Sequence, residues 1–274
     1  MEINLLVVNV GNSRIALGSF IAGDLKTVIR VDSAEPETWP AAIKEIWESI
    51  DGRENAAIIG ASVNPDRAKE FEETLTHITH QRMAWIGKDI DVPIHVKTEH
   101  PLRTGVDRIL NIAAAYEQMQ KACIVVDVGT AITVDCCNDA GDFLGGSIAP
   151  GAKTMLDSLH EKTSQLPQVK LEEPAGPYGR DTKQAMLHGV YHGIRGMVKE
   201  LAEQYATELG SWPEIIATGG DAKLLFGNWE LIHAIVPDLT LYGIALAFVE
   251  NDLENRNEEK QHSIPVRFER GTGE

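Results

Sequence analysis

The hydrophobic and polar positions at the start of the chain predict a β-hairpin. Residues 3–10 form a short run rich in β-branched side chains and leucine, which the pair Gly11-Asn12 ends. From Arg14 to Phe20 the apolar residues resume an extended pattern. Short runs of this kind, bounded by turn residues, are typical of strands. We therefore expect a strand, a tight turn and a second strand.

The same pattern returns further along the chain. The segment VVDVGTAITVD, residues 125–135, aligns without gaps on VVNVGNSRIAL, residues 7–17. Each position of the second copy lies 118 residues after its counterpart, as Asp127 does after Asn9. A repeat of this length is about one domain and is too long for a solenoid unit. The sequence thus predicts a duplicated domain whose two halves face each other.

Between these strands the apolar positions recur with the spacing of α-helices. The predicted helices cover residues 39–50, 65–77, 108–119, 154–160 and 182–209. Strands alternating with helices predict an α/β fold with mixed sheets flanked by helices. We place the domains at residues 1–112 and 113–250, and residues 91–102, rich in Pro, His and charge, form the loop into the second half. Residues 251–274 are charged and lack an apolar face, so we expect a poorly ordered tail.

Net charge restricts the partners of this chain. Its 274 residues include 41 acidic and 25 basic side chains, a formal charge of −16. Such a surface repels nucleic acid and anionic membranes, although a pocket of backbone N–H groups can still hold a small anion. The first residues have neither a basic region nor a long apolar run, so we expect no signal peptide and no membrane span. A cytoplasmic protein is the expectation.

Neither the cysteines nor the histidines form a recognisable disulfide or metal pattern. Cys123, Cys136 and Cys137 lie in apolar, strand-like segments without the spacing of a zinc knuckle. We expect them to be small buried residues. His188 and His192 are four residues apart on a predicted helix, but no third ligand is evident. A surface or packing role is expected for both.

Two glycine turns are candidates for phosphate binding. Gly11-Asn12 and Gly129-Thr130 each join two strands and place backbone N–H groups at the tip. Glycine lets a phosphoryl oxygen approach closely, and a small hydroxyl or amide adds a donor. Either turn alone is typical of an ordinary hairpin, but its repetition favours function. Asp127 at the strand end could hold a metal ion or simply cap the strand.

A third candidate is the segment TGVDR, where Gly105, Asp107 and Arg108 lie just ahead of a predicted helix. An Asp near a helix start is usually structural, because it satisfies an unpaired N–H group. Asp followed by Arg also offers a base beside a cation, which could accept a proton from a hydroxyl and hold an anion. Both interpretations stay open from the residues alone.

Two further loops are weaker candidates for phosphate or nucleotide binding. FLGGSIAPGAKT has Gly146 and Gly151 spaced as in a phosphate-binding P-loop, but Ala152 intrudes before Lys153, so we reject that motif. Gly219 and its neighbouring glycine follow an apolar strand, where a nucleotide base or ribose could lie.

The ordered set of motifs resembles the type III pantothenate kinases of the actin, sugar kinase and Hsp70 superfamily. The resemblance runs from Leu5 to about Ala247, through VVNVGNSRIALG, ASVNP, TGVDRILNIAAAY, VVDVGTAITVD, FLGGSIAPG, TSQLP, GRDTKQAMLHGVYHGIRG, ATGGDAKLL and PDLTLYGIALA. It implies duplicated actin-like (ribonuclease H-like) ATPase domains. It also implies ATP-dependent phosphorylation of pantothenate to 4'-phosphopantothenate, the first committed step towards coenzyme A. The enzyme would be a homodimer that needs Mg²⁺ and a monovalent cation, K⁺ or NH₄⁺.

The resemblance also assigns roles to residues. Asp107 would be the general base, and Thr182 would reach the substrate bound by the neighbouring subunit. Asp127 would hold the monovalent cation, and Thr130 would touch ATP. The pantothenate site would be lined by Gly105, Val106, Asp107 and Arg108. The turn around the ATP phosphates would comprise Asn9, Val10, Gly11, Asn12, Ser13, Arg14, Ile15 and Ala16.

The predicted subunit contact lies on the helix that Thr182 opens. Its apolar side continues with helical spacing and could pair across a two-fold axis, although packing within one subunit is the alternative. The residues of this side are Ala185, Met186, Val190 and Ile194.

The chain departs from the family at two positions. Family members have Asp where this chain has Asn9, and a neutral oxygen attracts hydrated Mg²⁺ less strongly. A Tyr that commonly precedes the substrate motif is absent, and Thr98 is nearest by spacing. We interpret the chain as a working kinase in which Asp127 and the ATP phosphates hold Mg²⁺. The alternatives are a non-catalytic binding or accessory protein on the same scaffold, and a kinase with another acceptor.

Overall fold

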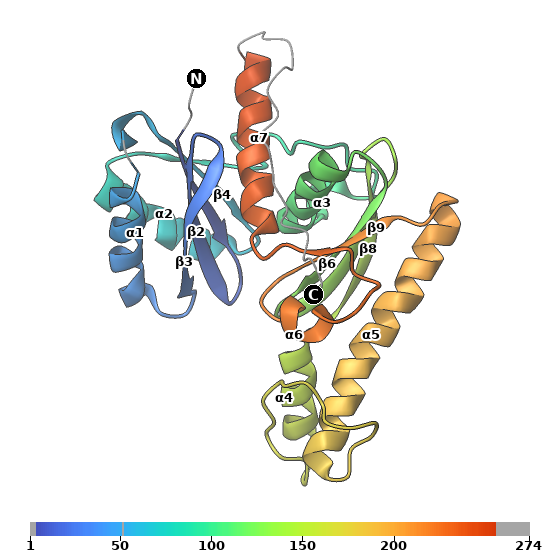
Figure 1. Ribbon diagram of the computed structural model, residues 1–274. Helices are drawn as coiled ribbons and strands as arrows, with labels where there is room; N and C mark the ends of the chain where they lie inside the picture. The colour runs from blue at the N-terminus through green and yellow to red at the C-terminus, as the bar shows by residue number, and fades with distance from the viewer. Residues whose placement is uncertain (1–3, 51, 256–274) are drawn as a thin grey trace. The chain divides into compact units, whose positions relative to one another are not determined.

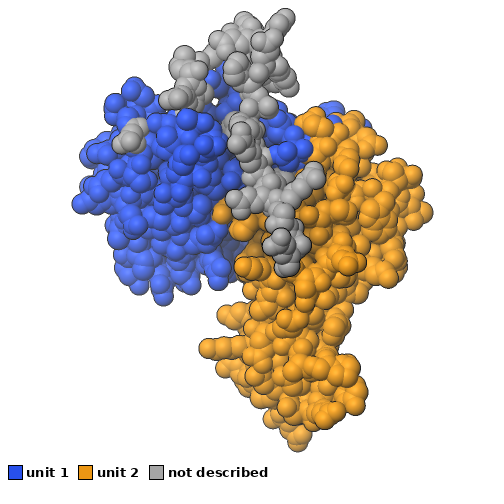
Figure 2. All heavy atoms as spheres, viewed as in Figure 1, with its two compact units in different colours: residues 1–118, 239–267 blue, residues 119–238, 268–274 orange. Residues whose placement is uncertain are grey.

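The computed structural model describes residues 4–50 and 52–255 of the chain (Figure 1). These residues form two compact units (Figure 2). The first holds the described residues up to 118 and those from 239 onward, and the second holds residues 119–238. Each unit is built on a five-stranded mixed sheet with helices packed on it, so the predicted α/β class is confirmed. None of the described helices is long and apolar enough to cross a membrane.

The first unit contains a sheet in the order β3-β2-β1-β4-β5. Its strands are β1 (Leu5–Val10), β2 (Arg14–Ile21), β3 (Asp24–Asp32), β4 (Ala57–Ser62) and β5 (Met83–Trp85). The first three strands form an antiparallel meander, while β4 runs parallel to β1 and β5 parallel to β4. The predicted opening hairpin is β1-β2.

Helices cover both faces of this sheet because β1 is apolar on both sides. Leu6 and Val8 pack in a core with residues of α1 (Trp39–Glu48) and α2 (Pro65–Thr79). On the other face, Leu5 and Val7 pack with residues of α3 (Val106–Met119) and α7 (Leu239–Asn255). Strands buried on both faces are typical of the parallel core of α/β proteins. Three short 3₁₀ helices complete the unit: Pro36–Thr38, Arg53–Asn55 and Pro101–Arg103.

The second unit repeats this strand arrangement in the order β10-β9-β6-β7-β8. Its strands are β6 (Cys123–Val128), β7 (Ala131–Cys137), β8 (Phe143–Pro150), β9 (Glu214–Thr218) and β10 (Ala234–Ile235). Asn9 in β1 is paired with Ala61 of β4, and Asp127 in β6 with Thr218 of β9. The duplication predicted from the two copies is therefore present in the sheets.

The helices of the second unit are α4 (Ala152–Lys162), α5 (Thr182–Leu209) and α6 (Ala222–Phe226). Helix α5 begins after Asp181, whose side chain accepts the Gln184 N–H, and ends at Gly210 in the left-handed conformation. Its apolar side packs inside the unit's own core with the strands of the sheet. Met186, Val190 and Ile194 are buried there, so they are not available for the predicted subunit contact.

The compact units differ from the predicted domain limits in two places. The first unit extends to residue 118 rather than 112, through most of helix α3. Residues 239–250, which we placed in the second domain, belong to α7 and pack on the first sheet. Residues 251–255 of the predicted tail are the last residues of α7, and residues 256–274 lie outside the described residues.

Candidate functional site

The first glycine turn, between β1 and β2, is closed by a short backbone bond. The Gly11 N–H donates to the Arg14 carbonyl at 3.0 Å. A Cβ atom on Gly11 would lie 2.9 Å from that carbonyl oxygen, closer than Cβ atoms normally approach. Glycine is therefore required at this position for steric reasons.

Ser33, which follows β3, holds this turn from outside the hairpin. Its N–H donates to the Ser13 carbonyl at 3.0 Å, and its hydroxyl donates to the Gly11 carbonyl at 3.0 Å. Ser33 is itself buried, with 1% of its surface exposed. Two hydrogen bonds from one buried residue fix the turn in one conformation.

The ASVNP segment supports the same turn from β4. The Ser62 hydroxyl donates to the Val10 carbonyl at 3.1 Å. The Asn64 amide donates to Asn12 Oδ1 at 3.3 Å. Asn64 also caps helix α2, where its Oδ1 accepts the Arg67 N–H at 3.2 Å. The segment thus links the turn to the start of a helix.

The predicted ATP-binding residues of the first unit lie on this turn and the strand ends beside it. Asn9 and Ala16 are half-buried and are paired across the hairpin. Asn12, Ser13 and Arg14 are exposed, whereas the side chains of the two apolar residues are buried and offer only backbone groups; these are Val10 and Ile15.

The second glycine turn, between β6 and β7, is held by the segment that follows β8. The Gly129 N–H donates to the Ala131 carbonyl at 2.9 Å. The Thr130 carbonyl accepts the Gly151 N–H at 2.9 Å and the Thr154 hydroxyl at 2.8 Å. A Cβ on Gly151 would collide with the Gly129 carbonyl, so glycine is required there too. The predicted nucleotide residue Thr130 is exposed at the tip.

Asp127 lies next to this turn, half-buried near the end of β6. Gly219, which follows β9, has a φ of 95° and packs directly on Asp127. The Asp221 N–H donates to the Val128 carbonyl at 3.3 Å. The strand-turn-helix at Gly219 therefore shapes the surroundings of the Asp127 carboxylate.

In the first unit, Asp107 lies in the first turn of α3, one residue inside the helix rather than ahead of it. Its Oδ1 accepts the Arg108 N–H at 2.9 Å. A Cβ on Gly105 would lie 2.7 Å from the same oxygen, so the carboxylate occupies the space above that glycine. Burial raises the pKa of Asp107, while the Arg108 N–H and guanidinium act in the opposite direction. A raised pKa brings a carboxylate closer to the range of a general base.

Thr98, which lies nearest by spacing to the position of the family Tyr, is hydrogen-bonded to the segment that begins the predicted substrate motif. Its hydroxyl lies 3.0 Å from the Thr104 hydroxyl, and Thr104 immediately precedes Gly105. This bond holds the preceding loop against the start of α3.

Thr182 is exposed at the first position of α5 in the second unit. The stretch before it folds back on the helix, because the Ala175 N–H donates to Gln184 Oε1 at 2.9 Å. Hydrophobic periodicity does not predict this fold-back, because the partners of Ala175 are the side chains of Gln184 and His188, which lie further along the helix.

The cysteines and histidines have structural positions, as expected. Cys123 and Cys137 are buried on paired strands with their sulfur atoms 3.3 Å apart. The rings of His188 and His192 stack at 5.3 Å on α5. In the part of the chain that the structure describes, no group of three His, Cys, Asp or Glu residues could hold a metal ion.

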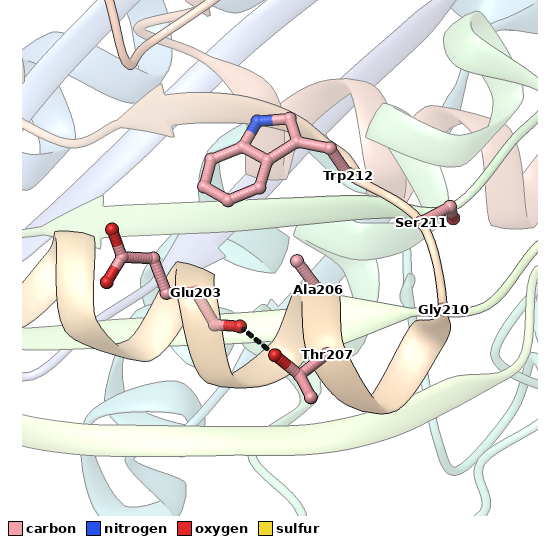
Figure 3. Close-up of a pocket in the computed structure, with 6 residues that line it drawn as sticks. All are labelled: Glu203, Ala206, Thr207, Gly210, Ser211 and Trp212. Carbon is pink, nitrogen blue, oxygen red and sulfur yellow. Dashed lines mark hydrogen bonds between the residues drawn. The ribbon is translucent and has the colours of Figure 1, made fainter.

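A surface hollow of about 480 Å³ lies at the end of α5 and contains none of the predicted site residues (Figure 3). It is open to solvent, with the exposed Trp212 on one side. It is lined by Glu203, Ala206, Thr207, Gly210, Ser211 and Trp212.

Known proteins are similar to this chain along most of its length. The sequence profile of type III pantothenate kinases matches residues 5–204. The type III pantothenate kinase of Dehalococcoides mccartyi is 33% identical over 256 residues, which cover 92% of this chain and 99% of that protein. That of Moorella thermoacetica is 33% identical over 253 residues, 90% and 99% of the two chains.

Solved structures agree on the fold. A Baf family transcriptional activator from Campylobacter jejuni has a TM-score of 0.58 at 22% identity, over 92% of this chain and 99% of that one. The activator of 2-hydroxyisocaproyl-CoA dehydratase from Clostridium difficile, with bound ADPNP, has a TM-score of 0.55 at 10% identity, over 95% and 100%. These likenesses confirm the predicted duplicated actin-like fold. The profile match, together with 33% identity to the two kinases over nearly their full length, shows that this chain belongs to the type III pantothenate kinase family.

Proposed function

We propose that this protein transfers the terminal phosphoryl group of ATP to the primary hydroxyl of pantothenate, giving 4'-phosphopantothenate for coenzyme A biosynthesis. The observation that carries this proposal is the match to family members along nearly the whole chain. The two braced glycine turns and the partly buried Asp107 supply the groups that the reaction needs.

Asp107 acts as the general base in this proposal. Its pKa, raised by burial, makes the carboxylate a better proton acceptor than an exposed one. The substrate hydroxyl gives its proton to Asp107 as its oxygen bonds to phosphorus, and ADP leaves. Gly105, Val106 and Arg108 would line the pantothenate site, and the Arg108 guanidinium would hold the substrate carboxylate.

The glycine turns bind the triphosphate. Phosphoryl transfer asks the protein mainly for positioning and charge neutralisation, and N–H groups in rigid turns supply both. Residues 9–16 of the first unit and Thr130 of the second take these roles.

The proposed cation sites depend on which carboxylates the chain has. Asp127 is a half-buried carboxylate whose Oδ1 borders the same space beside Gly219 as the Val128 carbonyl, and oxygen donors suit a hard cation. We assign K⁺ or NH₄⁺ to Asp127. Because Asn9 is neutral, Mg²⁺ would be held by Asp127 and by the ATP phosphates themselves. Bound cations neutralise the charge that develops on the transferred group.

The homodimer is part of the proposal because Thr182 would complete the substrate site of the partner subunit. The buried apolar side of α5 leaves its opposite face for this contact. That face is exposed and carries small residues, among them Ala185, Gly189 and Gly193. Light scattering at micromolar concentration should give twice the chain mass, and a monomer would contradict a shared site.

One assay tests the function. Purified protein with ATP, Mg²⁺, K⁺ and pantothenate should yield phosphopantothenate, detected by mass spectrometry. The absence of product with several nucleoside triphosphates and divalent ions would refute the kinase assignment and leave a binding or accessory role on this scaffold. Phosphorylation of another hydroxyl compound in preference to pantothenate would refute only the acceptor.

A further inference from the structure

The hydroxyl of Thr154 forms its hydrogen bond outside its own helix, as that of Thr240 in the first turn of α7 does with Asn111. Thr154 lies in the first turn of α4, and its hydroxyl donates to the Thr130 carbonyl, 24 residues earlier in the chain, at 2.8 Å. Threonine hydroxyls in helices often bond to a carbonyl of the preceding turn of the same helix. Thr74 does so with the Glu70 carbonyl, and Thr207 with the Glu203 carbonyl at 2.8 Å. The hydroxyl of Thr154 instead donates to a carbonyl of the glycine turn between β6 and β7.

The bond fixes the orientation of one peptide group. The Thr130 carbonyl also accepts the Gly151 N–H at 2.9 Å, so two donors from one segment hold it. In a planar trans peptide the C=O and the following N–H point in opposite directions. When the Thr130 carbonyl is held towards α4, the Ala131 N–H is held in the opposite direction. Thr130 and Ala131 are both exposed at the tip of the hairpin, so a ligand can reach the turn.

The first unit holds its own turn from the equivalent position. Ser33 immediately follows β3, as Gly151 immediately follows β8, and each donates its N–H to a carbonyl of its turn. In the first unit the additional hydroxyl is that of Ser33 itself, bonded to the Gly11 carbonyl at 3.0 Å. In the second unit Gly151 has no side chain, and Thr154 provides the hydroxyl. Both turns are thus held by an N–H and a hydroxyl from the segment after the third strand.

We propose that Thr154 is a positioning residue for the ATP triphosphate: its hydroxyl holds the Thr130 peptide so that the turn presents its N–H groups to a phosphoryl oxygen. This inference rests on the assignment of the Gly129-Thr130 turn to ATP in the proposed function. It adds a residue whose own side chain need not touch the nucleotide. A donor held in place before binding loses less conformational entropy when the ligand arrives.

Isothermal titration of Thr154→Val tests the proposal, because valine keeps the shape and removes the hydroxyl. The dissociation constant for a non-hydrolysable ATP analogue should rise about five- to tenfold, as expected for one lost orienting hydrogen bond. The dissociation constant for adenosine, which has no phosphates, should not change. In steady-state kinetics the KM for ATP should rise while the KM for pantothenate stays the same. Thr154→Ser, which restores the hydroxyl, should recover most of the affinity.

Thr207→Val is the matched control, because it removes an exposed hydroxyl bonded within its own helix (Figure 3). It should leave both dissociation constants unchanged. Thr154→Ala removes the same hydroxyl and replaces the valine variant if that variant does not fold. Unchanged affinity of Thr154→Val for the ATP analogue, or an equal loss for adenosine, would overturn the proposal. A wild-type protein that binds the analogue but forms no phosphopantothenate refutes the proposed function alone, and one that binds no analogue refutes both.

Discussion

Gly219 packs against the carboxylate of Asp127: a Cβ at residue 219 would lie 2.6 Å from Asp127 Oδ1. The glycine belongs to the turn after β9, and the aspartate lies near the end of the neighbouring strand β6. Its φ of 95° is accessible to glycine and strained for other residues. The position of the carboxylate therefore depends on the absence of a side chain on the adjacent strand end.

Gly219→Ala should displace Asp127 and lower kcat at least tenfold, because the added methyl group takes the space of the carboxylate. Gly210→Ala is the control, since Gly210 also has positive φ, 73°, but a Cβ there would meet no atom within 4 Å. Gly210→Ala should lose about 1 kcal/mol of unfolding free energy from backbone strain, and Gly219→Ala should lose more, because its Cβ would also meet the Val128 backbone. Only Gly219→Ala should lose activity; equal activities would show that the contact with Asp127 has no functional role.

Asp107→Asn should lower kcat by roughly 10²-fold or more while the protein stays folded, because it removes the basic oxygen and keeps the shape. Asp181→Asn is the control, since Asp181 caps α5 by accepting the Gln184 N–H at 2.8 Å, and Asn caps about as well as Asp. That variant should be nearly neutral in stability and leave the general base intact. A folded Asp107→Asn enzyme with unchanged kcat would refute the assignment of Asp107.

The raised pKa of Asp107 predicts the pH dependence of both activity and stability. The base form is lost as pH falls through the folded-state pKa, so kcat/KM should decline at a higher pH than an ordinary carboxylate would cause. A carboxyl group with a raised folded-state pKa stabilises the protein below its unfolded pKa, and this contribution is lost as pH rises through the folded pKa. At neutral pH, Asp107→Asn should therefore be at least as stable as the wild type in thermal unfolding. A lower Tm at neutral pH would contradict the effect of burial.

Asn9→Asp should lower the Mg²⁺ concentration needed for half-maximal activity and raise turnover, because it adds an anionic oxygen beside the phosphate turn. Asn12→Asp adds the same charge to an exposed position of the same turn and should have a smaller effect. An Mg²⁺ titration of the three proteins provides the measurement. Equal titration curves for wild type and Asn9→Asp would show that residue 9 takes no part in metal attraction.

Replacing K⁺ or NH₄⁺ with Na⁺ should strongly reduce turnover if Asp127 holds a monovalent cation. Asp127→Asn should lose most of the activation by K⁺, since a neutral amide attracts the ion less. The measurement is the initial rate at matched ionic strength with each chloride salt. Equal rates in the Na⁺-only buffer would assign Asp127 another role.

Local pattern was sufficient for the sheet hairpins and most helices. The runs around Gly11 and Gly129 alternate or stay apolar over the length of a strand, and helix 182–209 was predicted with the limits that the structure shows. Local pattern cannot show contacts between distant segments. The bonds from Ser33, Ser62 and Thr154 to the turns join residues that are 22, 52 and 24 positions apart. Many polar residues of the chain could have made such bonds, and only the fold selects these.

The residue types of the candidate site can be chosen from the sequence, but the contacts that hold these residues in place cannot. The sequence places Gly151 and Gly219 in loops after apolar strands, but it does not show that each lies against a neighbouring turn or carboxylate. The buried side of α5 was predicted as apolar, but periodicity cannot tell whether an apolar side packs within a subunit or between two.

Helix α7 sets an order for the folding of a newly made chain. The face of the first sheet that carries Leu5 and Val7 is covered in part by Leu241 and Ile244, which a ribosome adds only after residues 119–238. The second unit is continuous in the described chain, so all of its strands and helices can be synthesised before the first unit has its last helix. Until α7 is synthesised, one apolar face of the N-terminal sheet stays partly uncovered. A chain that stops before residue 239 would leave that face open to aggregation or to binding by chaperones.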